Sequence, residues 1–352
     1  MTSVRSTNQA LEEKPKVSVV VPCHNYAQYL DNAVQSALSQ EGVDVDVTIV
    51  DDASTDDSLL IARRWEKDDP RVRVRAHETN EGHIATFNEA LDSATSPYVV
   101  KLDPDDLLTP GSLRRSAEVL NKYPRVMFVY GQVAVFSGDV PTRVKGVGPR
   151  RTKIWTGQRW IEMRVKRLRN VIYQPEVMIR TSGLLKVGGH RAEIPAASDF
   201  NLWLRLASVG SVAYMGGAVQ GLARRHPTSM QHTIHAGKLA DFRARRSAFE
   251  QFFEEASSRI TGADRLREIN RSALALDALR LAFEETEDGN PTEEYLSEAA
   301  SLDPSVVRTI VWRSNSRRVR DQSHNGLEVR LERRIRDLQA RIRWRLWRRF
   351  GI

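Results

Sequence analysis

The chain has 352 residues and a net charge of +8 at pH 7, so it can bury a large core and is expected to have an acidic partner, such as nucleotide phosphate, nucleic acid or an anionic membrane face. Its single cysteine, Cys23, excludes a disulfide framework and favours a reducing compartment. No apolar run approaches the roughly 20 residues that cross a bilayer, and the first residues lack a signal peptide's apolar stretch, so we expect a cytoplasmic protein.

The N-terminal part of the chain alternates between strand and helix patterns. Residues 1–14 form a polar lead-in that we expect to be mobile. Four apolar runs then predict strands, at 17–21, 45–50, 71–75 and 98–102. Helical spacing follows the first three runs, at 26–38, from 54 onward and at 84–93, and Asn25 is placed to cap the first of these helices. This alternation predicts right-handed crossovers and a mostly parallel sheet.

Three of the predicted strands end in polar clusters. Pro22-Cys23 follows the first strand, Asp51-Asp52 the second, and Asp103-Pro104-Asp105-Asp106 the fourth. Ligands of such sheets bind beyond the carboxyl ends of the strands. We therefore expect the three clusters to converge on one rim and to form a binding site.

The last cluster concentrates three carboxylates within four positions. Asp103 and Asp105 point the same way if the backbone is extended, so they could address one hard cation together, with Asp106 beside them. Alternatively, Pro104 makes a turn, and one of the acids caps a helix that starts near Pro110.

An ordered set of motifs resembles family 2 inverting glycosyltransferases over residues 15–231. The motifs lie at 19–26 (Val-Val-Val-Pro-Cys-His-Asn-Tyr), 49–56 (Ile-Val-Asp-Asp-Ala-Ser-Thr-Asp), 80–82 (Asn-Glu-Gly), 102–106 (Leu-Asp-Pro-Asp-Asp), 188–189, 198–206 and 224–230. The resemblance implies the GT-A fold, an α/β architecture with a Rossmann-like, mostly parallel sheet flanked by helices. It also implies a hexosyltransferase-type enzyme that uses UDP-, GDP- or dTDP-sugars as donors.

The resemblance assigns a role to each motif. Donor nucleotide contacts fall on these residues: Pro22, Cys23, Asn25, Asp52, Asn80, Gly82 and Asp103. A divalent metal, manganese or magnesium, would neutralise the leaving diphosphate as a Lewis acid. Its ligands would be Asp105 first, then Asp103 and His226, with Asp106 a weaker candidate, and Arg225 would contact the diphosphate. The alternatives are helix capping for Asp51 and Asp52, a small buried side chain for Cys23, and a solvated basic turn at 225–226.

Inversion in one step requires a single base to take the acceptor hydroxyl's proton. The resemblance places this base at Asp199, just before a Leu-Trp-Leu-Arg-Leu helix. The family's usual acid in front of it is replaced by Ser198, so the immediate surroundings of the base differ here. The alternative role for Ser198 or Asp199 is to cap that helix, and one residue could both cap and act as base.

Other departures limit the resemblance. Relatives carry an arginine near Thr86-Phe87-Asn88 where this chain has none, so a base or phosphate contact is lost or supplied elsewhere. The Gln-x-x-Arg-Trp motif of processive synthases is absent from the corresponding part, which favours addition of one sugar or a few. A basic run from Arg150 to Arg169 favours an anionic acceptor, such as a lipid-linked phosphate, unless it is simply a solvated face.

The C-terminal third lies outside the resemblance. We expect a helical extension at 232–313, a polar linker at 314–325 and a basic amphipathic helix at 326–352. That last helix could lie on the inner face of a membrane as a peripheral contact, or pair with another copy as a coiled coil. No specific nucleic acid is expected.

The combined pattern predicts metal-assisted transfer of a sugar to a hydroxyl acceptor, which could be a glycan, a lipid-linked molecule or a secondary metabolite, in polysaccharide or cell-envelope biosynthesis. One alternative is a non-catalytic scaffold that binds membrane or nucleic acid beside a degenerate GT-A domain. A nucleotidyltransferase is disfavoured because Pro22-Cys23-His24-Asn25 is not a glycine-rich phosphate loop. The motifs encode neither the donor sugar nor the acceptor.

Overall fold

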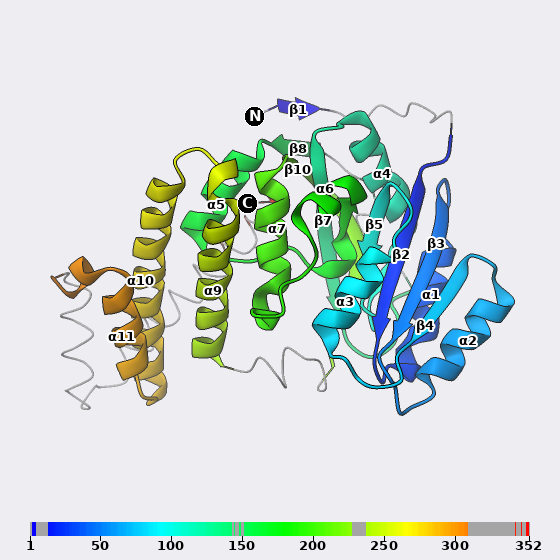
Figure 1. The fold of residues 1–352 in the computed structure, drawn as a ribbon, viewed down its shortest axis with the longest axis horizontal. Coiled ribbons are helices and arrows are strands. Elements are labelled where there is room, and N and C mark those ends of the chain that lie inside the picture. The colour runs from blue at the N-terminus through cyan, green and yellow to red at the C-terminus, as the bar shows by residue number, and fades with distance from the viewer. Residues whose placement is uncertain are drawn as a thin grey trace. The chain divides into compact units, whose positions relative to one another are not determined.

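The computed structural model describes residues 2–4, 13–142, 144, 148, 151–226, 237–308, 342, 346, 350 and 351. The chain forms two compact units. The sheet unit comprises 1–160, 171–229 and 351, and the helical unit comprises 161–170, 230–350 and 352. Figure 1 shows the helices and strands of both units.

A ten-stranded mixed sheet organises the sheet unit, in the order β1-β8-β10-β7-β9-β5-β2-β3-β4, with β6 paired to β10. The strands are β1 (Thr2–Val4), β2 (Lys16–Cys23), β3 (Asp44–Asp51), β4 (Val72–Ala76), β5 (Tyr98–Lys101), β6 (Leu107–Leu108), β7 (Val126–Phe136), β8 (Arg151–Trp155), β9 (Val177–Arg180) and β10 (Ser211–Arg224). The half built from β5, β2, β3 and β4 is entirely parallel, as is the pair of β7 and β10. The predicted α/β fold and its four N-terminal strands are confirmed.

Helices connect the parallel strands and pack on the sheet (Figure 1). In the sheet unit they are α1 (Ala27–Leu38), α2 (Ser58–Asp68), α3 (His83–Asp92), α4 (Ser112–Lys122), α6 (Thr181–Val187) and α7 (Ser198–Ser208), with single turns η1 (Gln174–Glu176) and η2 (Pro195–Ala197). The core beneath them is continuous: Val19 and Val21 of β2 pack in one cluster with Leu30 and Val34 of α1. Each such fully buried side chain stabilises the fold by about 1.5–3 kcal/mol.

The loops that open α1 and α2 cap one another. Asn25 has a left-handed backbone, with φ of 61°, and its Oδ1 accepts a hydrogen bond from the Thr55 N–H at 2.7 Å. In return, Asp56 Oδ2 accepts from the Ala27 N–H, at 3.0 Å, in the first turn of α1. The expectation that Asn25 caps its own helix is therefore wrong, because Asp56 from the neighbouring loop satisfies that donor.

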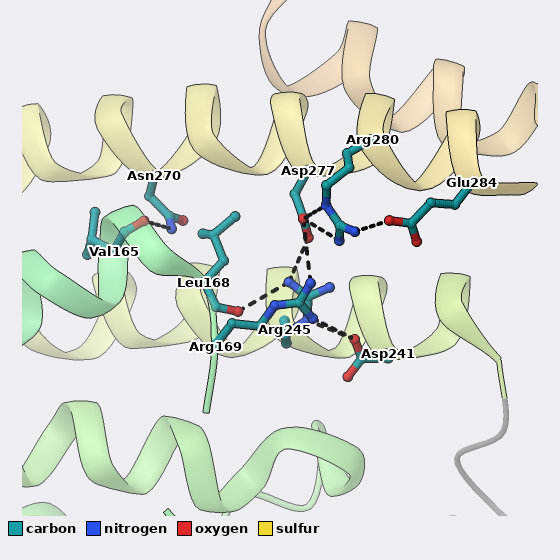
Figure 2. A network of polar contacts seen from close by, with 9 residues as sticks. All are labelled: Val165, Leu168, Arg169, Asp241, Arg245, Asn270, Asp277, Arg280 and Glu284. Atoms are coloured by element: carbon teal, nitrogen blue, oxygen red, sulfur yellow. Dashed lines mark hydrogen bonds and ion pairs between the residues drawn. The ribbon is translucent and has the colours of Figure 1, made fainter. Parts of the chain in front are cut away.

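The helical unit contains α9 (Lys238–Ala256), α10 (Ala263–Asp288) and α11 (Glu293–Leu302), with turns η3 (Ser257–Arg259) and η4 (Pro304–Arg308). Residues 161–170 also belong to it, although they precede the rest by many positions and include most of α5 (Gly157–Arg167). Asn270 donates to the Val165 carbonyl at 3.2 Å and Arg245 donates to the Leu168 carbonyl at 3.2 Å (Figure 2). These donors satisfy carbonyls that the end of α5 leaves open.

An ion network ties the same segment to α9 and α10 (Figure 2). The carboxylate of Asp277 in α10 forms ion pairs with Arg280 at 2.8 Å, with Arg245 at 3.0 Å and with Arg169 at 3.7 Å. Burial alone would raise the pKa of Asp277, but the three neighbouring guanidinium groups outweigh burial and hold its pKa below the ordinary value. Asp277 is therefore the charged centre that joins three segments of the helical unit.

Several expectations about the ends of the chain meet the structure only in part. Residues 2–4 form β1 and pair with β8, so the lead-in contributes a strand that the polar composition did not indicate. The predicted linker at 314–325 lies outside the described residues, as does most of 326–352. Of that last range, Ile342, Leu346 and Phe350 are exposed, whereas Gly351 is buried in the sheet unit, where its carbonyl accepts from Tyr130 Oη at 2.8 Å. Among the described residues, no helix is long and apolar enough to span a membrane.

Candidate active site

The site begins where β2, β3 and β5 end. These strands are parallel neighbours, with Cys23 opposite Asp51 and Val20 opposite Lys101. Their carboxyl ends therefore lie along one rim of the sheet, as the strand order of the sequence predicts. Two groups of polar side chains form there. The group after β2 and β3 comprises His24, Asn25, Asp52, His77 and Asn80 and is called the nucleotide cluster after its predicted role, and the acidic cluster after β5 comprises Asp103, Asp105 and Asp106.

The first strand delivers Pro22 and Cys23 to the rim as backbone rather than as reactive side chains. Both are buried, and burial raises the pKa of the Cys23 thiol to about 12, which keeps it protonated at neutral pH. The Cys23 carbonyl accepts from the Asp52 N–H at 2.8 Å, which joins the ends of β2 and β3. The alternative of a small buried side chain thus describes the Cys23 thiol.

His24 then links the three predicted motifs of the nucleotide cluster. Its Nδ1 lies 2.7 Å from the Asp52 carbonyl, and its Nε2 lies 3.2 Å from the side-chain nitrogens of Asn25 and Asn80. The sequence brought these motifs to one rim, but His24 received no role there. In the structure its ring contacts a residue of each of these motifs.

Asp52 is buried, with an exposed fraction of 2%, and binds the loop that carries Asn80 and Gly82. Its Oδ1 accepts from the Glu81 N–H at 2.7 Å and its Oδ2 from the Gly82 N–H at 3.0 Å. Burial would raise the pKa of Asp52, but these bonds and one from His77 outweigh it and lower the pKa. Contact with a nucleotide base stays a prediction for Asp52, and holding the 80–82 loop is the role that its geometry shows.

His77 is a member of this cluster that the sequence gave no reason to select. It follows β4 directly, with Nδ1 2.8 Å from Asp52 Oδ1 and Nε2 2.6 Å from Glu89 Oε2. Burial would lower the pKa of His77, but its bonds to the two carboxylates outweigh burial and raise the pKa. Its position at the end of a predicted strand was the one available signal, and exposed strand ends often carry polar residues without function.

The acidic cluster gives its three aspartates different surroundings. Asp103 Oδ1 accepts from Lys101 Nζ at 2.5 Å, whereas Asp105 Oδ2 lies 2.9 Å from His226 Nε2. Asp106 is buried and its Oδ1 accepts from the Arg224 N–H at 2.9 Å. Burial, and then the nearby carboxylates, raise the pKa of Asp105 and, more strongly, that of Asp106. The structure thus brings Asp105 and His226 together, as predicted, and places Asp106 within the protein as a support.

The end of β10 closes this cluster. Arg224 donates from Nε to the Asp105 carbonyl at 3.2 Å, and its guanidinium lies over the Tyr29 ring, 4.6 Å from the centroid. The Tyr29 ring in turn lies 5.3 Å from the His226 ring. Arg225, predicted to contact a diphosphate, is exposed and its side chain makes no polar contact with the described residues. Sequence analysis missed Arg224, which orients the loop while its neighbour remains available to a ligand.

The donor set fits a divalent cation that takes further ligands from a substrate. Within the described part of the chain, no three His, Cys, Asp or Glu side chains converge as a complete metal site. Mg²⁺ and similar cations, however, commonly bind through one or two carboxylates together with substrate phosphates. The Asp105 carboxylate and the His226 imidazole, 2.9 Å apart, provide such a pair, and a cation would offset the like charges that raise the pKa of Asp105.

Asp199 lies in the first turn of α7, half-buried, and its Oδ1 accepts from the Phe200 N–H at 2.6 Å. Ser198, which stands in place of the expected acid, lies 3.0 Å from His190 Nδ1 through its hydroxyl. Burial holds the pKa of His190 well below its usual range, so this pair is neutral at pH 7. Asp199 is therefore an acid at a helix N-terminus, where the helix dipole favours its ionised form.

Comparisons with known proteins agree with this geometry. Residues 18–184 match the family described as glycosyl transferase family 2. A chondroitin synthase of Pasteurella multocida strain Pm70 is 28% identical over 202 residues, which cover 57% of this chain and 20% of that protein. This chain thus spans about a fifth of that relative's length.

Two solved structures share the fold at low sequence identity. S. aureus TarS 1-349 in complex with UDP-GlcNAc has a TM-score of 0.60 at 16% identity, covering 87% of this chain and 89% of that one. The mannosyltransferase PcManGT from Pyrobaculum calidifontis in complex with GDP-Man and Mn2+ has a TM-score of 0.55 at 16% identity, covering 96% of this chain and 84% of that one. These likenesses show the GT-A fold.

Proposed function

We propose that this protein transfers a sugar from a nucleotide-diphosphate sugar to a hydroxyl acceptor with inversion at the anomeric carbon, and the match of residues 18–184 to glycosyl transferase family 2 supports this proposal. The observation that carries the proposal is the Asp105–His226 pair, 2.9 Å apart, on the same rim as the nucleotide cluster. A non-catalytic scaffold that no longer binds a nucleotide sugar would not require a carboxylate and an imidazole placed side by side at this rim.

The donor half of the reaction uses the rim. The strand-end backbone at 22–23 and the loop at 80–82, held by Asp52, form the seat for the nucleoside. A manganese or magnesium ion, when bound, would supply charge neutralisation for the departing diphosphate. Asp105 and His226 would hold it, and the exposed Arg225 would add a charge-assisted hydrogen bond to the same phosphates.

The acceptor half requires a base. The acceptor hydroxyl oxygen forms a bond to the anomeric carbon, the bond from that carbon to the diphosphate oxygen breaks, and the hydroxyl proton passes to a carboxylate of the protein. Asp199 takes this role in the proposal because it is half-buried and lies at a helix N-terminus that favours the carboxylate. One displacement with one base gives inversion.

The acceptor's charge receives less support than its hydroxyl group. The basic run at 150–169 does not form one solvated face, since Lys153 and Arg164 are buried and Arg169 pairs with acids of the helical unit. Among the described residues of the run, the other exposed cations are Arg151, Arg159, Lys166 and Arg167. These exposed side chains are the support for an anionic or lipid-linked acceptor. The other features of the site fit a neutral glycan acceptor equally well.

A thermal-shift screen tests the donor half directly. Purified protein is heated with UDP-, GDP- and dTDP-sugars, each with and without Mn²⁺. A ligand that binds only the folded state raises the unfolding temperature, so we expect one nucleotide class to raise it, and to do so more strongly with the metal. The absence of any shift with every donor would contradict the proposal.

A further inference from the structure

Lys101, the last residue of β5, is a buried lysine beside the acidic cluster. Its exposed fraction is 3%, its Nζ lies 2.5 Å from Asp103 Oδ1, and the same ammonium lies 3.7 Å from the centroid of the Phe87 ring. A buried ammonium is costly unless it is paired, and here a carboxylate and an aromatic face supply the pairing. The strand itself needs only another apolar residue, as at Val99 and Val100, so the lysine serves the loop.

The contact leaves Asp103 with one occupied and one available oxygen. Its side chain is 31% exposed, and Oδ2 makes no hydrogen bond with any described residue. Asp105 differs, because its side chain is 12% exposed and it pairs with the ring of His226, whereas Asp103 pairs with a lysine. The two acids therefore present different chemistry to a ligand, although they are two positions apart.

The different partners of Asp103 and Asp105 give the two carboxylates different affinities for a cation. Lys101 is the cation that pairs with a carboxylate of the acidic cluster, since the Arg224 guanidinium donates to the carbonyls of Asp105 and Gly138. The Phe87 ring that faces the ammonium also lies 5.5 Å from the rings of His83 and His190. A carboxylate already compensated by an ammonium is a poor ligand for a divalent cation, yet it still accepts hydrogen bonds from neutral hydroxyl groups.

We propose that Lys101 is a positioning residue that divides the donor between the two acids. It fixes Asp103 so that Oδ2 accepts from the ribose hydroxyl groups of the donor, and it leaves the metal to Asp105 and His226. This inference rests on the proposed function and adds to it the residue that sets which acid binds which part of the donor. Phe87 contributes to this positioning, because its ring lies 3.7 Å from the same ammonium.

Binding of Mn²⁺ tests the division. Free Mn²⁺ is measured by electron paramagnetic resonance in the presence of UDP or GDP, whichever raises the unfolding temperature of the wild-type protein. We expect Asp105→Asn to weaken Mn²⁺ binding by about tenfold or more and Asp103→Asn to change it by less than about threefold. Equal losses in the two variants would overturn the proposal.

Binding of the nucleotide tests the role of Lys101 itself. By calorimetry, Lys101→Met and Asp103→Asn should each lower the affinity for UDP or GDP by about tenfold. The double variant should bind the nucleotide no more weakly than either single variant, because both substitutions remove the same contact. The preference of the wild-type protein for the nucleotide over its 2′-deoxy analogue should also be lost in each. Additive losses, or a retained preference, would contradict the role.

Controls separate the possible failures. Lys67→Met removes an exposed lysine of α2 outside the site and should leave both affinities unchanged. If Lys101→Met does not fold, Lys101→Arg keeps a cation and should retain the hydroxyl preference, and loss of that preference would count against the proposal. If the wild-type protein binds neither nucleotide, the proposed function itself fails, which is a different result from any of these variant patterns.

Discussion

Asp199 illustrates how one residue can serve two purposes. Its carboxylate accepts the Phe200 N–H in the first turn of α7, which is a structural contact, and the half-buried position allows it to meet a substrate. The N-cap of α7 is Ala197 and no side chain caps this end, so the predicted cap at Ser198 or Asp199 is wrong. The contact with Phe200 and a catalytic role are compatible because a carboxylate has several acceptor sites. The neutral Ser198–His190 pair beside it adds no like charge.

Replacing Asp199 with asparagine should separate the two purposes. The amide oxygen can still accept from the backbone, so the unfolding temperature should change little, but the amide cannot take a proton. We expect kcat to fall by about 10²–10⁴-fold, the usual contribution of general base catalysis, with little change in donor binding.

The matched control is Glu193→Gln, which neutralises an exposed acid of the preceding loop. Its activity should match that of the wild-type protein. An Asp199→Asn variant that keeps more than half of the wild-type kcat would mean that another group takes the proton.

At the scale of elements, the end of β4 is fastened to α3 through one histidine. His77 contacts Asp52 with one ring nitrogen and Glu89 with the other, and Asp52 in turn holds the 80–82 loop. The 80–82 loop, where we propose that the nucleoside binds, is therefore linked through Asp52 to the His77 ring, which lies between two carboxylates.

The stability that the Asp52–His77–Glu89 contacts (here called the latch) give to the folded protein should depend on pH. The pKa of His77 is raised in the folded protein, so its contribution is fully present below the unfolded pKa of about 6.5 and is lost as pH rises through the folded pKa. The pKa values of Asp52 and Glu89 are lowered, so their contribution is lost as pH falls through those folded values. Urea unfolding should therefore show His77→Gln to cost about 1.5–3 kcal/mol near pH 6 and less near pH 9.

A parallel series on Thr79→Ala, an exposed neutral position in the loop that follows His77, supplies the control. That variant should lack the pH dependence of His77→Gln. The latch would be disproved by a His77→Gln cost that stays constant across the whole pH range.

The helical unit depends on Asp277 in a comparable way. Arg245, Arg280 and Arg169 come from different segments and meet at this one carboxylate (Figure 2). Asp277→Asn would remove the carboxylate shared by the buried Arg245 and by the more exposed Arg280 and Arg169. Arg245 keeps its pair with Asp241 and Arg280 its pair with Glu284, so we expect the free energy of unfolding of the helical unit to fall by about 3 kcal/mol, the lower end for breaking a buried pair.

Chemical denaturation followed by circular dichroism measures this cost. Asp264→Asn, at an exposed position near the start of α10, supplies the control and should change stability by less than about 1 kcal/mol. Equal effects of the two substitutions would show that the network is a set of weak surface pairs.

At the scale of the whole molecule, residues 161–170 belong to the helical unit, although the segments directly before and after them in sequence belong to the sheet unit. They precede much of the sheet unit in sequence, yet their carbonyls at Val165 and Leu168 are satisfied by α10 and α9. We expect a fragment ending at residue 229 to be less stable than the full chain, because it exposes these carbonyls and the apolar face around them.

Thermal unfolding of the fragment and the full chain, at equal concentration, tests this expectation. The fragment should unfold at a lower temperature or aggregate, and adding nucleotide should narrow the difference only partly. A fragment as stable as the full chain would show that 161–170 needs nothing from the helical unit.

The sequence revealed the strands and the rim because both are local patterns. Apolar runs that end at Pro22, Asp51 and Asp103 fix where parallel strands stop, and parallel strands stop at one edge. The contacts of His77 and Lys101 were beyond reach, because each depends on side chains brought together from separate elements. That residues 161–170 belong to the helical unit could not be predicted for the same reason, since their partners Arg245 and Asn270 lie far along the chain.

The most direct test of the proposed reaction is the anomeric configuration of the product. The protein is incubated with Mn²⁺ and the nucleotide sugar identified by thermal shift, with water or a simple glycoside as acceptor, and the product is followed by proton nuclear magnetic resonance. We expect nucleoside diphosphate to be released together with a sugar of configuration opposite to that of the donor, and Asp199→Asn to abolish both signals. A product that retains the donor's configuration would contradict a single displacement with one base.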